Sequence, residues 1–150
     1  MKAWTRSMSG KAELRFIGKV EKACEEETLV NIYPEYCDGL RGIEAFSHLI
    51  ILYWAHLRDN DKERQTLLVF PRKHQMKAET GVFACRSPSR PNPISLCVVR
   101  LLRTEGCNLV IKGLDAFAGT PIIDIKPYLP RADLVSDASA PEWSQHGPPT

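Results

Sequence analysis

The stretch ISLCVVRLLRTEGCNLVIKGL, residues 94–114, decides the fold. Two runs rich in apolar and β-branched residues, 94–103 and 108–114, flank the triplet Thr104-Glu105-Gly106. This triplet is a hairpin turn signal, because Gly106 can take a positive φ angle without steric cost. We therefore predict two antiparallel strands joined by a tight turn.

Similar short runs lie on both sides of this hairpin. The twelve-residue apolar segment 46–57 can be a core helix or a central strand, and Ile50, Ile51, Tyr53 and Trp54 favour a strand. A short helical turn is expected at 38–45. The remaining predicted strands are 13–20, 28–33, 66–70, 81–85 and 121–125. Many short strands separated by turn signals indicate an antiparallel barrel or sandwich.

Composition and motifs exclude several classes of protein. The chain has 150 residues, of which 43% are hydrophobic and 25% charged, so it is not a disordered chain. The net charge of +2 does not by itself indicate nucleic-acid binding, which would need a local basic patch. Neither G-x-G-x-x-G nor G-x-x-x-x-G-K-[ST] occurs, which argues against Rossmann enzymes and P-loop NTPases.

One domain is expected, with short segments on either side of it. Residues 1–12 are predicted to be a flexible N-terminal segment, residues 13–130 the domain, and residues 131–150 a proline-containing C-terminal tail. The apolar run 49–55 is too short for a membrane helix, which needs roughly 18–20 residues. The first residues lack the apolar core of a signal peptide. We therefore expect a cytoplasmic protein.

The cysteines are odd in number, and no two have the C-x-x-C spacing. No cysteine and histidine cluster has zinc-binding spacing, so we expect no metal site. We predict that all five thiols are reduced and structural: Cys24, Cys37, Cys85, Cys97 and Cys107.

The most unusual stretch is GVFACRSPSRPNPI, residues 81–94. Three prolines within six residues fix φ and remove backbone donors, so we predict a rigid loop that does not hydrogen-bond to itself. Arg86 and Arg90 are expected to project from it. A preorganised loop with guanidinium groups suits a carboxylate or a phosphate. The alternative is a proline-rich connector with solvated arginines.

Two further clusters allow both structural and functional interpretations. Asp124 and Lys126 share one face of the strand predicted there, either as a surface ion pair or as the polar rim of a site that Gly119 opens. His48 and His56 bracket the apolar run 49–55, and a histidine beside such a run is more often a hydrogen-bonded edge residue than a catalyst. No serine or cysteine lies in a hydrolase motif. The sequence therefore names no catalytic residue.

Three segments together resemble one family. They are FSHL at 46–49, GVFACRSPSRPNPI at 81–94 and GTPIIDIKPY at 119–128, and they resemble the TrmO (YaeB/TsaA-like) family. Members of that family are S-adenosylmethionine-dependent methyltransferases that act on N6 of the threonylcarbamoylated adenosine beside the tRNA anticodon. The likeness covers roughly residues 13–130 in the same order. It implies a mainly β fold, namely a single-sheeted antiparallel β-barrel with short helical turns, and a homodimer.

The resemblance also implies the residues of the site. The cofactor S-adenosylmethionine would contact His56, Leu57, Arg86, Leu96, Ala118, Gly119, Thr120 and Pro121. The tRNA substrate would contact Arg90, Asn92, Asp124, Lys126 and Tyr128. Arg90 or Lys126 would pair with the threonine carboxylate of the modified adenosine, and Tyr128 would stack on a base.

Some positions differ from the family pattern. The family's S-P-[FY]-K…P-R-Q-x-G segment is replaced by VEKACEEE at 20–27, and the Asp before Gly119 is Ala118. Three interpretations follow: a tRNA methyltransferase, a small barrel that binds S-adenosylmethionine or a small anion without methylating tRNA, and a methyltransferase with another substrate.

Overall fold

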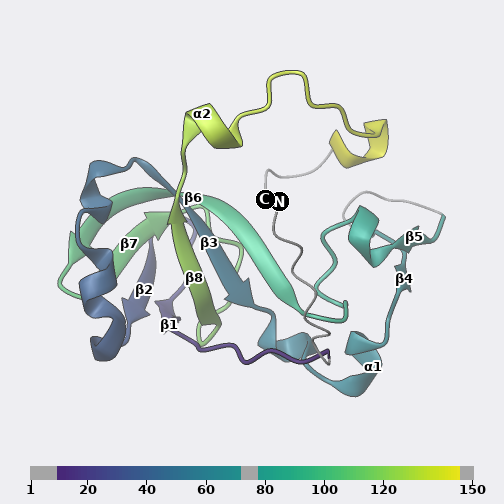
Figure 1. Cartoon of the computed structure of the whole chain (residues 1–150), viewed down its shortest axis with the longest axis horizontal. Helices are drawn as coiled ribbons and strands as arrows, with labels where there is room; N and C mark the ends of the chain where they lie inside the picture. Colours follow the sequence, from purple (N-terminus) through teal and green to yellow (C-terminus); the bar gives the residue numbers. More distant parts are fainter. Residues whose placement is uncertain (1–9, 72–77, 146–150) are drawn as a thin grey trace, which may run out of the picture.

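A computed structural model describes residues 10–71 and 78–145 of the chain. Within them six strands close into an antiparallel barrel in the order β1-β2-β7-β6-β3-β8 (Figure 1). The barrel strands are β1 (Gly18–Lys22), β2 (Thr28–Ile32), β3 (His48–Trp54), β6 (Ile94–Glu105), β7 (Asn108–Lys112) and β8 (Pro121–Pro127). The predicted antiparallel barrel is confirmed. Residues 1–9, most of the predicted N-terminal segment, lie outside the described residues.

The hairpin predicted at 94–114 is formed by β6 and β7. Glu105 pairs with Asn108 across the turn, and Gly106 has a φ angle of 62°, as predicted. Strand β6 is longer than expected because it continues past Arg103 to the turn. The hairpin therefore supplies the longest strand of the barrel.

Strand β3 pairs with β6 on one side and with β8 on the other. Leu49 and Ile51 on β3 are fully buried, so the strand interpretation of the segment 46–57 is confirmed. Their alternation with partly exposed neighbours is the period-2 pattern of a strand with one buried face. The barrel core consists of Val20, Val30, Ile32, Leu49, Ile51, Cys97, Val99, Leu109, Ile111 and Ile122.

The first strand begins later than predicted. Leu14 and Phe16 are exposed, and β1 starts only at Gly18, where the backbone passes close to β2. A Cβ atom at Gly18 would collide with the carbonyl oxygen of Asn31, so only glycine permits this approach. The predicted strand at 13–20 is therefore correct only in its last three residues.

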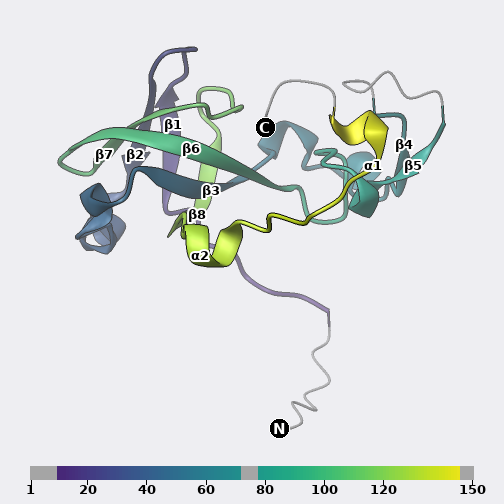
Figure 2. The same cartoon turned by 90° about the horizontal axis from the view of Figure 1, so that it is seen from above.

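A second, smaller lobe projects from the barrel (Figures 1 and 2). Its described residues are 55–71 and 78–93. It contains helix α1 (Asp61–Arg64), a two-stranded sheet of β4 (Leu68–Val69) and β5 (Thr80–Gly81), and the 3-10 turns η3 (His56–Arg58) and η5 (Val82–Ala84). The strand predicted at 66–70 is shorter than expected. The strand predicted at 81–85 is wrong beyond Gly81, because the chain turns there as η5.

Short helical turns surround the barrel. The turn expected at 38–45 is present as η1 (Pro34–Leu40) and η2 (Ile43–Ala45). After β8 the chain forms α2 (Pro130–Asp133) and η6 (Glu142–Gln145), and residues 146–150 lie outside the described part of the tail. Among the described helices, none is long and apolar enough to cross a membrane.

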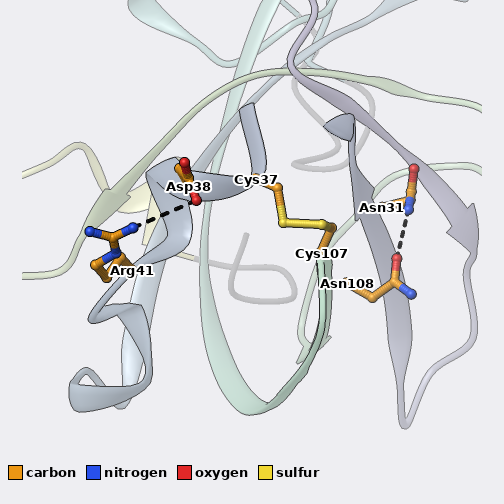
Figure 3. The surroundings of a disulfide bond; sticks show 6 residues. All are labelled: Asn31, Cys37, Asp38, Arg41, Cys107 and Asn108. Atoms are coloured by element: carbon orange, nitrogen blue, oxygen red, sulfur yellow. Dashed lines mark hydrogen bonds and ion pairs between the residues drawn. A yellow bond between two sulfur atoms is a disulfide. The ribbon is translucent and has the colours of Figure 1, made fainter. Parts of the chain in front are cut away.

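A disulfide joins Cys37 in η1 to Cys107 beside the β6–β7 turn (Figure 3). The prediction that all five thiols are reduced is therefore wrong. The two cysteines are 70 residues apart, and only the packing of η1 against the end of this hairpin brings them together. Beside the disulfide, Asn31 Nδ2 donates to Asn108 Oδ1 at 2.7 Å. Cys24, Cys85 and Cys97 are free.

Candidate functional site

The end of the proline-rich motif at 81–94 and the start of the motif at 119–128 lie at one end of the barrel. Trp54 at the end of β3 pairs with Ile94 at the start of β6. The preceding residue of β3, Tyr53, pairs with Ile122 near the start of β8. The end of β3 and the beginnings of β6 and β8 therefore lie together, and we call this end of the barrel the mouth.

The predicted cofactor residues belong to segments that enter or leave the mouth. The first two follow β3, Arg86 lies in the connection to β6, and four lead into β8. Leu96 lies on the outer face of β6, opposite Leu52, with 41% of its surface exposed. The mouth residues of this set are His56, Leu57, Arg86, Leu96, Ala118, Gly119, Thr120 and Pro121.

The segment before β8 is a turn that leaves its backbone open. Gly119 has a φ angle of 86°, and a Cβ atom there would meet no other atom within 4 Å. Its N–H donates to the carbonyl of Val20 at 2.7 Å, while the neighbouring Thr120 is buried. This backbone is fixed on β1 and accessible from outside, which is what a ligand contact requires.

Polar side chains from β3 and β6 lie inside the mouth. Tyr53 Oη donates to the carbonyl of Asp115 at 2.8 Å, and Cys97 Sγ donates to the carbonyl of Gly113 at 3.0 Å. Burial raises the pKa of Tyr53 to about 12. Burial also raises the pKa of the Cys97 thiol, although the nearby charge of Arg86 acts in the opposite direction. Both groups are therefore neutral donors near pH 7.

The proline-rich loop differs from its prediction in one respect. Arg90 does not project, because its guanidinium donates to the carbonyls of Val82 at 3.0 Å, Ser87 at 3.1 Å and Cys85 at 3.4 Å. The loop therefore hydrogen-bonds to itself through a side chain, contrary to our expectation. Arg86 is exposed, as predicted.

Side chains of helix α1 contact both this loop and Trp54 of the barrel. Arg64 Nε donates to the carbonyl of Pro91 at 2.9 Å, and its guanidinium lies 5.7 Å from the centre of the Trp54 ring. Glu63 accepts a hydrogen bond from Ser89 and pairs with Arg58 at 2.9 Å. The hydrogen bond from Ser89 and the charge of Arg58 lower the pKa of Glu63.

A cavity of about 480 Å³ lies where the N-terminal segment, the barrel and the lobe meet. Leu14, Trp54 and Ile94 form part of its apolar lining, and Arg64 and Asn92 contribute polar atoms. Its volume is within the range of small-molecule sites, roughly 300–1,000 Å³. Of the predicted substrate residues, Asn92 lines this cavity.

The structure separates the predicted substrate residues into two groups. Arg90 and Asn92 lie near the mouth, whereas the backbone N–H of Tyr128 donates to the carbonyl of His48, at the opposite end of β3. Lys126 of β8 pairs with Ile50 of β3, which is also toward the end of β3 that lies away from the mouth. Its ammonium contacts Asp124 at 2.8 Å, and this hydrogen bond and charge raise the pKa of Lys126. The surface ion pair is thus present, and the two groups do not meet within one chain.

Sequence reasoning missed the residues that hold the site in place. Tyr53 and Cys97 were seen only as members of apolar strands, although period-2 alternation puts Ser95 and Cys97 on one face of β6. Asn60 caps α1 by accepting from the Glu63 N–H at 3.1 Å, and Asn followed by Glu three residues later is a helix-start signal. Among the described residues, no group of three or more His, Cys, Asp or Glu side chains could hold a metal ion.

Known proteins are similar to this chain in sequence and in architecture. The model of the tRNA-methyltransferase O N-terminal domain matches residues 19–134. A probable S-adenosyl-L-methionine-binding protein of Methanothermobacter thermautotrophicus is 50% identical over 103 residues, which are 69% of this chain and 70% of that protein. The tRNA (adenine(37)-N6)-methyltransferase of Escherichia coli is 42% identical over 135 residues, 87% of this chain and 56% of that enzyme.

A solved structure agrees with these matches. The crystal structure of TrmO from Pseudomonas aeruginosa superimposes with a TM-score of 0.72 and 27% sequence identity, covering 96% of this chain and 66% of that one. The chain thus spans just under two thirds of the solved TrmO protein and just over half of the Escherichia coli enzyme. The resemblance seen in the three sequence motifs is confirmed, and the chain belongs to the tRNA-methyltransferase O family.

Proposed function

We propose that this protein is an S-adenosylmethionine-dependent methyltransferase that acts on N6 of the threonylcarbamoylated adenosine beside the tRNA anticodon. The observation that carries the proposal is that the proline-rich motif at 81–94 and the start of the motif at 119–128 meet at one end of the barrel, in a chain that belongs to the family. The named relatives, an adenine-N6 tRNA methyltransferase and S-adenosylmethionine-binding proteins, support the same chemistry. The protein would act in the cytoplasm, where tRNA is found.

The residues of the mouth fit the cofactor chemically. Its carboxylate needs a cationic donor, which Arg86 offers, and its adenine needs apolar surface, which Leu57 and Leu96 expose. The open backbone at Gly119 permits close approach. The proposed cofactor contacts are His56, Leu57, Arg86, Leu96, Ala118, Gly119, Thr120 and Pro121. When bound, the cofactor supplies a methyl group on a sulfonium centre.

The chain's own contribution to transfer is positioning. The adenine N6 would have to approach the methyl carbon in line with the C–S bond that breaks, and it would release its own proton to water as the N–C bond forms. Holding the two partners in this geometry would lower the barrier, and no covalent nucleophile is needed. The proposed substrate contacts are Arg90, Asn92, Asp124, Lys126 and Tyr128. Lys126 keeps its ammonium exposed at the surface, so it is better placed than Arg90 to exchange its present partner for the threonine carboxylate.

A homodimer could bring together the two groups of substrate residues that lie apart within one chain. The outer face of β6 exposes a row of apolar side chains, each about two fifths exposed: Ile94, Leu96, Val98 and Leu102. The exposed Arg100 lies between Val98 and Leu102 in this row, and an apolar row of this kind on a barrel surface is typical of a protein interface. A second copy packed on this face could bring the Lys126 and Tyr128 of one chain toward the mouth of the other.

One observation favours a second function, a binding module without tRNA methylation. The segment that replaces the family's P-R-Q motif is a tight hairpin tip, in which Cys24 Sγ donates to the Glu27 carbonyl. Glu26 and Glu27 of this tip pair with Lys112 at 2.6 Å and Arg103 at 2.8 Å. These two carboxylates of the tip therefore contact side chains of β6 and β7. In addition, Ala118 supplies no carboxylate at the mouth.

A methyl-transfer assay decides between the two functions. Purified protein and labelled cofactor are incubated with tRNA that carries threonylcarbamoyl-adenosine and with the same tRNA lacking that group. Transfer only to the modified tRNA is expected, and Lys126→Met should weaken it more than Lys62→Met, a matched change on the exposed surface of α1. Cofactor binding without transfer to either tRNA would leave the binding module as the function.

A further inference from the structure

The connection between β7 and β8, residues 113–120, carries three of the four residues in the proposed cofactor contact Ala118–Pro121, and we call this connection the arm. Its downstream half is fixed on β1 by two backbone hydrogen bonds. The Gly119 N–H donates to the Val20 carbonyl at 2.7 Å, and the Val20 N–H donates to the Thr120 carbonyl at 2.9 Å. Strand β7 ends at Lys112, so the upstream half of the arm, which begins at Gly113, is not part of a strand.

Side chains from two neighbouring strands hold the upstream half. Tyr53 of β3 donates its phenol proton to the Asp115 carbonyl at 2.8 Å. Cys97 of β6 donates its thiol proton to the Gly113 carbonyl at 3.0 Å, and the Asp115 backbone hydrogen-bonds to the same sulfur. Tyr53 pairs with Ser95 across the strands, two residues before Cys97, so both side chains reach the arm from adjacent positions of the mouth.

Both donors keep their protons under working conditions. Burial raises the pKa of Tyr53 to about 12 and raises the pKa of Cys97 above its usual value. A phenolate or a thiolate could not donate to a carbonyl oxygen. Both side chains are therefore protonated near neutral pH and can donate the two hydrogen bonds.

We propose that Tyr53 and Cys97 are positioning residues that hold the arm in its binding geometry before the cofactor arrives. A loop already ordered in the free protein loses less entropy when a ligand binds, so the two side chains raise affinity without touching the ligand. This inference rests on the proposed function, because it takes Ala118–Pro121 as a cofactor contact. It adds residues that lie outside the three motifs of the resemblance.

The direct test is Tyr53→Phe, which removes one hydroxyl and keeps the ring. We expect the dissociation constant for S-adenosylhomocysteine, measured by calorimetry, to rise about fivefold, in line with the loss of one hydrogen bond. Amide hydrogen exchange in residues 113–117 of the free protein should become faster. Tyr36→Phe, a hydroxyl removed from η1, is the matched control and should change neither reading.

A second pair of variants keeps the test independent of the ring. Cys97→Ser retains a donor and should bind nearly as well as the wild type, whereas Cys97→Ala should weaken binding and speed exchange in the arm. If Tyr53→Phe and Cys97→Ala both bind within twofold of a wild type that binds, the positioning role is overturned and the proposed function stands. If the wild type itself does not bind, the proposed function fails, and the inference fails with it.

Discussion

The barrel and the lobe of this molecule are stabilised in different ways. Inside the barrel Leu49, Ile51 and Ile111 are fully buried, and strand pairing closes the sheet on itself. The lobe leaves Phe70 half exposed and Phe83 78% exposed, and polar contacts from α1 hold its proline-rich loop. Apolar burial thus sets the scaffold, and a few directed hydrogen bonds set the loop that carries the candidate site.

The largest effect is expected at the end of the barrel far from the mouth. Reducing the Cys37–Cys107 disulfide releases a constraint across 70 residues, which in the chain-entropy model stabilises the folded state by about 4 kcal/mol. Denaturant unfolding with and without dithiothreitol measures this loss. Cys24→Ser, which alters an exposed free thiol, should leave both curves unchanged. Equal stability of the reduced and oxidised forms would contradict this prediction.

The second test compares apolar side chains of the two regions. Leu49→Ala leaves a cavity in the barrel core and should lower the free energy of unfolding by about 3 kcal/mol. Leu67→Ala removes the same atoms from an exposed side chain of the lobe, so a change within about 0.5 kcal/mol is expected. Urea titration of both variants measures the contrast. Similar losses would mean that the lobe also depends on apolar burial.

The third test removes the hydrogen bonds that Arg64 of α1 donates to the proline-rich loop and to Asp59. Arg64→Met keeps an apolar stem beside Trp54 and removes the donors to Pro91 and Asp59, with a local cost of about 1–2 kcal/mol. We expect faster proteolysis within the loop 86–93 and a melting temperature close to that of the wild type. Arg41→Met, which removes an exposed ion pair with Asp38, is the control. Unchanged proteolysis in Arg64→Met would show that the loop is rigid without α1.

The smallest effect concerns pH. The pKa of Glu63 is lower in the folded protein than in the unfolded chain, so its contribution is complete above the unfolded pKa and is lost as pH falls through the folded value. Amide chemical shifts of Ser89 and its neighbours should therefore change at acidic pH while barrel amides do not. In Glu63→Gln this step should disappear. A step that persists in the variant would assign the titration to another group.

The barrel could be predicted because its pattern is local. Alternation along 94–103 and 108–114, with Gly106 between them, specifies a hairpin, and the run around Ile51 specifies a central strand. The start of β1 could not be predicted, since it depends on the close approach of Gly18 to Asn31 across the sheet. The Cys37–Cys107 pairing was missed for a similar reason, because it follows from tertiary packing rather than from spacing.

The sequence motifs predict which residues share the proline-rich loop, but they do not predict how the side chains of that loop are arranged. The motifs named Arg86, Arg90 and Asn92 together, and the structure keeps them in one loop near the mouth. That Arg90 serves the loop's own carbonyls is a matter of side-chain direction, which no spacing encodes. The separation of Tyr128 from the mouth likewise depends on the length of β3, about 20 Å for seven residues.

The most direct test of cofactor binding is calorimetric titration of the oxidised protein with S-adenosylmethionine and with S-adenosylhomocysteine. We predict saturable binding in the micromolar range for both, weakened by Arg86→Ala and unaffected by Arg41→Ala at the other end of the barrel. Absence of binding at millimolar ligand would contradict the account. It would mean that this barrel retains the family's architecture without its cofactor.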